Sequence, residues 1–121
     1  MIAEHIDTIL LVTGIFTCLI VVGFIFPRRL LRILFNMEQA SAGVLLMFRH
    51  WSLVIFLIGG LLVYAAYSPA VRPAALVVAI VEKFAIGVLV AVSPARNVRL
   101  ALVAGGDAIM ASIYLLYLMG R

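Results

Sequence analysis

Four long apolar stretches dominate the pattern of this chain, and short polar segments separate them. The stretches cover residues 6–26, 48–68, 71–92 and 98–119. A helix needs about 20 apolar residues to cross the hydrocarbon of a bilayer, and each stretch provides them. We therefore predict an all-α fold, an integral membrane four-helix bundle formed by a single domain, residues 1–121.

The segment PRRLLRILFNME, residues 27–38, lies between the first two stretches and has a different pattern. At about 100° per residue, its arginines fall on one side of a helix and most of its apolar residues on the other. This is typical of a short amphipathic helix that lies in the membrane interface with its basic face toward the headgroups. A plain polar connector is the alternative. The arginines are Arg28, Arg29 and Arg32.

The composition favours a membrane protein over a soluble one. Of the 121 residues, 67% are hydrophobic and 12% are charged, against about 45–50% and about 25% in soluble domains. A soluble core of this size cannot bury so much apolar surface. The net charge of +4 therefore indicates topology and headgroup contact, and we expect no nucleic-acid partner. The single cysteine, Cys18, excludes a disulfide within these residues.

The distribution of arginines predicts an orientation, because cytoplasmic loops of membrane proteins carry an excess of basic residues. Three arginines follow the first span, and the next loop on that side contains Arg96 and Arg99, whereas the opposite side has Arg72 and Arg121. We therefore predict a protein of the bacterial inner membrane with both termini outside the cytoplasm. An aromatic belt is expected on the outer side, formed by Tyr64, Tyr67, Tyr114 and Tyr117.

Arg49 and His50 stand inside the second apolar stretch, and two placements are open for them. Counted back from Tyr67, Arg49 lies about 27 Å away, close to the full hydrocarbon thickness of about 30 Å. Arg49 would then contact headgroup phosphates, and Trp51 would lie in the inner aromatic belt. If the second span instead begins near Ala42, both side chains move inward and line a small-molecule pocket.

Three ionisable residues lie too far from either end of a span to reach water. Glu82 is about 16 Å from the inner end of the third span and Asp107 is about 15 Å along the fourth, so both reach mid-membrane. An ionised side chain there costs at least about 2.5–3.5 kcal/mol. We predict an ion pair between Lys83 and Asp107. Glu82 projects about 100° away from Lys83, so it needs a different neighbour, a proton or a partner at an interface between subunits. The three residues either fix helix register or form a working site.

Small residues at the same depth predict where helices approach each other closely. They are Gly59 and Gly60 in the second span and Gly105 and Gly106 in the fourth. We therefore expect the second span to pack against the fourth. Thr13 and Thr17 add hydroxyls to the first span, which either donate to Glu82 or Asp107 or bond to their own backbone.

Motifs of classical enzymes are absent from the sequence. No pair of carboxylates is spaced for hydrolysis, and no Ser, Thr or Cys has an evident activating base. The two histidines, His5 and His50, are too far apart in sequence for a metal-binding motif. Whether the protein is an enzyme is open, with the balance against it. We predict no metal and no resident cofactor, although a quinone or a lipid would suit so apolar a chain.

The string RHWSLVIFLIGGLLVYAAYSPAVR, residues 49–72, is followed by Glu82-Lys83. This string and the four-span layout resemble the small bacterial membrane proteins grouped as DoxX-like. The resemblance implies four helices, a positive turn after the first span and a second span led by an arginine. Some members are implied to serve as membrane subunits of quinone-linked oxidoreductases. The resemblance thus implies a role beside other subunits, and it carries over no catalytic residue.

Three functions follow from this sequence, in order of preference. The first is a small non-enzymatic accessory or structural subunit of a homo-oligomer or larger membrane complex, whose partners are membrane lipids and other subunits. The second is a proton-coupled transporter or binder of small hydrophobic or cationic molecules that uses Glu82 and Asp107. The third is a membrane-embedded isomerase or quinone-handling protein that adds His50 to these carboxylates.

Overall fold

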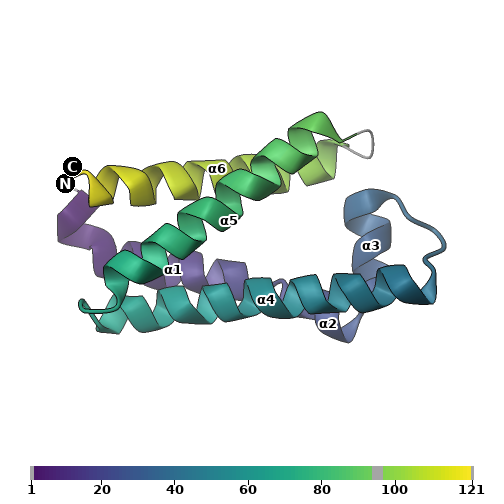
Figure 1. Ribbon diagram of the computed structural model, residues 1–121, viewed down its shortest axis with the longest axis horizontal. Coiled ribbons are helices and arrows are strands. Elements are labelled where there is room, and N and C mark those ends of the chain that lie inside the picture. Colours follow the sequence, from purple (N-terminus) through teal and green to yellow (C-terminus); the bar gives the residue numbers. More distant parts are fainter. Residues whose placement is uncertain (1, 94–96, 121) are drawn as a thin grey trace.

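The computed structural model describes residues 2–93 and 97–120, and within these ranges it contains helices and no strand (Figure 1). Four helical stretches are long and apolar enough to cross a membrane, namely Ile6–Ile25, Ala42–Tyr67, Arg72–Val92 and Val98–Leu118. This confirms the all-α class and the four apolar helices. The helices are η1 (Ile2–His5, a 3₁₀ turn), α1 (Ile6–Cys18), α2 (Val21–Ile25), α3 (Pro27–Phe35), α4 (Ala42–Tyr67), α5 (Arg72–Val92) and α6 (Val98–Leu118).

The long helices associate as two pairs. α1 packs along α4 and α5 packs along α6, and these are the two most extensive contacts between helices. α5 runs obliquely across the bundle and also contacts α4, so it connects the two pairs (Figure 1). The start of η1 and the end of α6 lie together at one end of the bundle, whereas α3 lies at the opposite end. We call these the terminal end and the α3 end.

Two apolar clusters fill the interior. The larger one lies toward the terminal end and consists of Ile6, Leu10, Leu62, Ala65, Ala66, Ala75, Leu76, Ala79 and Tyr114. The smaller one joins α3 to the last turns of α5 and the first turns of α6, and consists of Leu34, Val90, Leu100 and Ala104. Alanines are frequent in both clusters, and their small side chains let the helix backbones approach closely.

The first span is interrupted where α1 passes into α2. The backbone N–H groups of Leu19 and Ile20 donate to carbonyls three residues earlier, at 3.2 and 3.3 Å, which is the tighter hydrogen bonding of a 3₁₀ turn. Beyond this turn, Gly23 lies against α4, where a Cβ would come within 2.6 Å of Ser52 Oγ. The apolar stretch predicted as one helix over 6–26 therefore consists of two consecutive helices, α1 and α2, joined by this turn.

The amphipathic segment forms α3, which begins with Pro27 in its first turn and ends at Phe35. Asn36 ends it in the left-handed conformation, with φ of 54°. Leu31 and Leu34 are buried, whereas the arginines of α3 are exposed. α3 lies across the direction of α4 (Figure 1).

The start of α6 holds the end of α3 in place. Asn97 caps α6 by accepting a hydrogen bond from the Leu100 N–H at 3.0 Å, and its side-chain amide donates to the Leu34 carbonyl at 2.7 Å. Arg99 donates to the Ile33 carbonyl at 3.3 Å. These bonds satisfy carbonyls in the last turn of α3, for which the helix itself has no N–H donor.

α4 begins at Ala42, the earlier of the two starts that the sequence left open. The Ser41 side chain caps it by accepting from the Val44 N–H at 3.2 Å. With 26 residues the helix is about 39 Å long, which exceeds the hydrocarbon thickness of about 30 Å.

The glycines do not bring the second span against the fourth. That expectation is wrong, because the helix that packs closely against the second span is the first. Gly59 of α4 packs against α1, where a Cβ would lie 2.8 Å from the Cys18 nitrogen and from the Gly14 carbonyl oxygen. A Cβ at Gly60, Gly105 or Gly106 would meet nothing within 4 Å, so these three glycines make no close helix contact in this structure.

Candidate functional site

Lys83 is the centre of a buried polar cluster that joins three helices. Its side chain is 1% exposed, and its ammonium lies 3.1 Å from Asp107 Oδ1 on α6. The same ammonium donates to Thr17 Oγ1 on α1, also at 3.1 Å. The ion pair that depth along the spans predicts is therefore present, and it has a third member that the sequence did not assign.

Thr13 and Thr17 each bond to their own helix, which is the second of the two roles considered for them. The Thr17 hydroxyl donates to the Thr13 carbonyl at 2.8 Å, and the Thr13 hydroxyl donates to the Ile9 carbonyl at 2.7 Å. Because each threonine hydroxyl donates its proton to its own helix, its oxygen remains available as an acceptor for a neighbouring helix. Lys83 uses the Thr17 oxygen, and the Tyr114 hydroxyl donates to the Thr13 oxygen.

Glu82 lies next to Lys83 and does not find a separate neighbour. Its Oε2 is 4.0 Å from the Lys83 ammonium. That oxygen is buried and has no hydrogen-bond partner among the described residues. Of the three solutions considered for Glu82, a different neighbour is not found among the described residues, whereas a bound proton or a partner in another subunit stays a prediction. Glu82 thus has an ionic neighbour but unused acceptor capacity.

A cavity of about 220 Å³ opens beside these charges, toward the α3 end. Glu82, Lys83 and Asp107 form part of its wall. The rest is mainly apolar and comes from five helices: Phe16, Thr17, Leu19, Ile20, Leu30, Leu34, Trp51, Ile55, Ile86, Leu100 and Val103, with Leu19 and Ile20 in the turn after α1. Ligand pockets usually measure about 300–1,000 Å³. This one suits a few waters or a small solute rather than a complete quinone.

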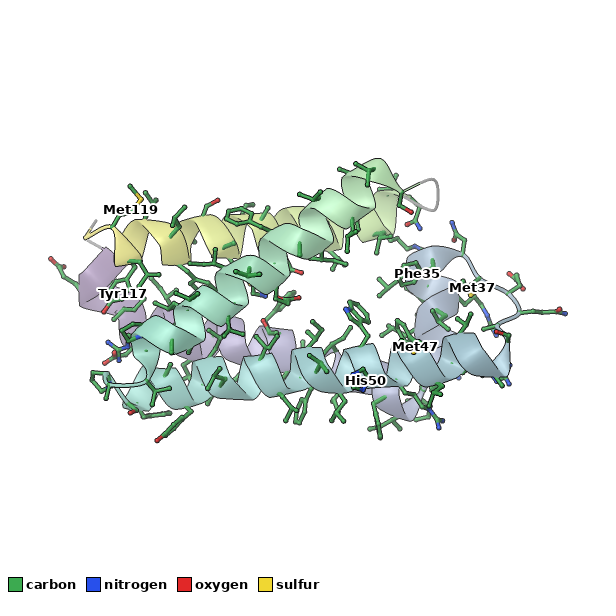
Figure 2. The ribbon with its side chains drawn as sticks, in the orientation of Figure 1. Phe35, Met37, Met47, His50, Tyr117 and Met119 are labelled. Carbon is green, nitrogen blue, oxygen red and sulfur yellow. The ribbon has the colours of Figure 1, made fainter. Side chains whose placement is uncertain are left out.

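Arg49 and His50 differ from Trp51 in their environment. Arg49 and His50 are exposed although α4 begins at Ala42, and neither lines the cavity. Figure 2 marks His50 on α4, in the half of the helix nearer α3. Trp51 is half-buried, packs against Phe48 with ring centroids 5.3 Å apart, and lines the cavity. Arg49 instead lines a separate groove beside α3, and His50 lines neither this cavity nor that groove.

Two polar contacts near the terminal end were not predicted from the sequence. Tyr114, expected in the outer aromatic belt, is fully buried in the core and donates to Thr13, which corrects that expectation. Arg72, considered only for topology, is buried and donates to Asp7 Oδ1 at 2.8 Å and to the Ala65 carbonyl at 3.0 Å. A tyrosine near the end of a span fits either place, so its pattern carries no signal for the choice.

The basic residues that predicted orientation gather at the α3 end. Arg28, Arg29 and Arg32 belong to α3, and Arg99 lies in the first turn of α6. Arg96 and Arg121 lie outside the described residues. Among the described residues, no group of three His, Cys, Asp or Glu side chains could hold a metal ion.

Comparisons of this chain with protein-family models, with curated proteins and with solved structures find no match. The resemblance of residues 49–72 to the DoxX-like proteins therefore stays a prediction. The site has to be interpreted from its own geometry.

Proposed function

We propose that this is an integral membrane protein whose four apolar stretches all cross the bilayer. Its exterior supports this, because large aliphatic side chains on each of the four stretches point away from the core. Examples are Val12, Leu57, Val81 and Leu102, which are 59%, 59%, 64% and 71% exposed. Water does not tolerate so extensive an apolar surface, whereas lipid does. The positive-inside rule assigns the arginine-rich α3 end to the cytoplasm, both termini to the outside, and α3 to the interface.

Its function is that of a non-enzymatic subunit that packs against another membrane helix. The observation that carries this proposal is an apolar groove of about 700 Å³ between α5 and α6. Small residues of both helices line it, among them Gly87, Ala101, Gly105 and Ala108. In lipid, small residues favour helix association because they let another backbone come close. The partner is a second copy of this chain or another membrane subunit.

The charged cluster supports a structural role for the α5–α6 pair. Lys83 and Asp107 join α5 to α6, and the hydrogen bond from Lys83 to Thr17 joins α5 to α1. Each of these contacts directs a polar group inward, so the outer groove keeps an apolar surface. A groove on a fixed helix pair is ready for a partner and needs little rearrangement when it binds.

The test compares leucines at two open glycines. Gly105 lines the groove and Gly60 does not, yet a Cβ at either position meets no atom within 4 Å. Neither new Cβ therefore clashes with a neighbouring helix, and both variants should fold. Native mass spectrometry after gentle extraction from the native membrane should show partner-bound protein for the wild type and for Gly60→Leu, and free protein for Gly105→Leu. A bare wild-type monomer, or retention of partners by Gly105→Leu, contradicts the proposal.

A second candidate function is a proton-coupled binder or transporter of small molecules. It is favoured by the buried Oε2 of Glu82, which has no hydrogen-bond partner among the described residues and belongs to a residue that lines the cavity. Exchange of a small cation across liposomes should then depend on pH in the wild type and lose that dependence in Glu82→Gln. Equal exchange by both proteins excludes Glu82 from such a mechanism. The third function has no geometric support, because His50 does not line the cavity.

A further inference from the structure

A second groove lies at the α3 end, between α3 and the first two turns of α4. It has a volume of about 620 Å³. We call it the arginine groove. Its polar wall consists of Arg28, Arg29, Arg32 and Arg49, and its apolar wall consists of Ile25, Phe26, Pro27, Ala42, Leu45 and Leu46.

The four guanidinium groups have no ionic partner among the described residues. No acidic residue lines the groove, and among the described residues no carboxylate forms an ion pair with any of the four arginines. Arg29 lies over the Phe26 ring at 5.9 Å from its centroid, which holds its guanidinium against the groove wall. Four like charges in one groove repel one another, so an anion that binds there gains attraction and relieves that repulsion.

The groove lies at headgroup depth if α4 spans the membrane, and on that part of the proposed function the inference rests. Eighteen residues separate Arg49 from Tyr67, which corresponds to about 27 Å of helix and nearly crosses the hydrocarbon. By the same count the hydrocarbon ends near Met47, so the turn before it lies in the headgroup layer and the long side chain of Arg49 reaches that layer. α3 is amphipathic and lies across α4, so its arginines occupy the same layer.

We propose that the arginine groove binds an anionic phospholipid that carries two phosphate groups, as cardiolipin does. Guanidinium groups bind phosphate oxygens in pairs, and four of them match two phosphates. Basic pockets between helices on the cytoplasmic side suit such headgroups. Ile25 and Phe26, at the end of the first span, provide an apolar surface for the first part of the acyl chains. A free phosphate would leave this apolar wall in contact with water.

The experiment measures lipid binding to the purified protein by native mass spectrometry in detergent. Cardiolipin, phosphatidylglycerol at twice the concentration, and phosphatidylcholine are the probes. Arg28→Gln/Arg49→Gln removes one charge from each helix of the groove. Arg99→Gln removes a charge at the same end of the bundle but outside the groove, and glutamine keeps a side-chain N–H for the Ile33 carbonyl of α3. Thermal unfolding of each variant checks that the fold persists.

The wild type should retain cardiolipin more strongly than either other lipid. The double variant should lose about 25-fold in cardiolipin affinity, about fivefold for each arginine, whereas Arg99→Gln should stay near the wild type. Arg28→Lys/Arg49→Lys should retain part of the affinity, because lysine keeps the charge but not the paired hydrogen bonds.

Three results would overturn the inference. These are equal retention of all three lipids, an equal loss in Arg99→Gln, and displacement of cardiolipin by millimolar pyrophosphate, which would assign the groove to a soluble phosphate compound. Gly105→Leu separates this inference from the subunit proposal, because it should release protein partners and leave cardiolipin binding unchanged. The arginine variants should keep the protein partners and lose cardiolipin.

Discussion

The two helix pairs are held together in different ways. α1 and α4 meet backbone to backbone, with Gly14 and Gly59 so close that neither position has room for a Cβ. α5 and α6 are joined by the ion pair of Lys83 and Asp107, and their small residues face outward into the apolar groove. Glycines thus allow close backbone contact between α1 and α4, whereas at the α5–α6 seam they line a groove that is free to bind a partner. Substitutions at the two seams should therefore have effects that differ in size and in kind.

The largest loss of stability is expected from Lys83→Met at the α5–α6 seam. It leaves Asp107 without a counter-charge and should lower the free energy of unfolding by about 3–5 kcal/mol. Exchanging the two residues, Lys83→Asp/Asp107→Lys, keeps the pair and should cost less than either single change. Unfolding by SDS titration in mixed micelles measures all of these variants. If the exchange is as damaging as the single changes, the pair is not what joins α5 to α6.

A smaller loss is expected from overpacking the α1–α4 seam. In Gly59→Leu the new side chain begins 2.8 Å from backbone atoms of α1, which cannot move as the end of a side chain can. The free energy of unfolding should fall by about 1–3 kcal/mol. Gly60→Leu, one residue away with open space around it, is the matched control and should stay near the wild type. Thermal unfolding in detergent provides the comparison, and equal behaviour of the two variants would refute the tight seam.

The smallest effect is expected where α6 is joined to α1. Tyr114→Phe removes the hydroxyl that donates to Thr13 and leaves the ring in place. The loss should be about 0.5–1.5 kcal/mol, as for a single buried hydrogen bond. Tyr64→Phe is the control, because Tyr64 is 57% exposed. A shift of the unfolding midpoint in Tyr64→Phe as large as in Tyr114→Phe would show that the buried contact contributes nothing.

The sequence predicts depth along a helix well and predicts neighbours poorly. Apolar length alone locates the four long helices, and counting residues brings Lys83 and Asp107 to one level. The same counting also brings Gly59 and Gly105 to one level, but Gly59 packs against α1 and Gly105 has no helix within close contact. Depth is set by the rise per residue, whereas the choice of neighbour depends on how all helices rotate and pack. One sequence contains the first quantity and only indirectly the second.

Tyr114 and Arg72 illustrate the same difficulty for polar residues near a helix end. Each lies close enough to an interface to be assigned to water or headgroups. The structure instead buries both, because Thr13 offers Tyr114 an acceptor and Asp7 offers Arg72 a negative charge. These acceptors lie 101 and 65 positions away in sequence. Local pattern cannot connect residues at such separations.

The position of Arg72 has a consequence for how the chain is assembled in time. The Ala65 and Ala66 carbonyls belong to the last turn of α4 and have no acceptor role within that helix. Arg72 donates to both, at 3.0 and 3.2 Å, and its ion pair with Asp7 attaches the start of α1. During synthesis, α1 and α4 emerge before this guanidinium exists. Until α5 begins to emerge, the Ala65 and Ala66 carbonyls and the Asp7 carboxylate therefore lack the guanidinium that binds them. A nascent chain that stops before residue 72 lacks all three of these contacts.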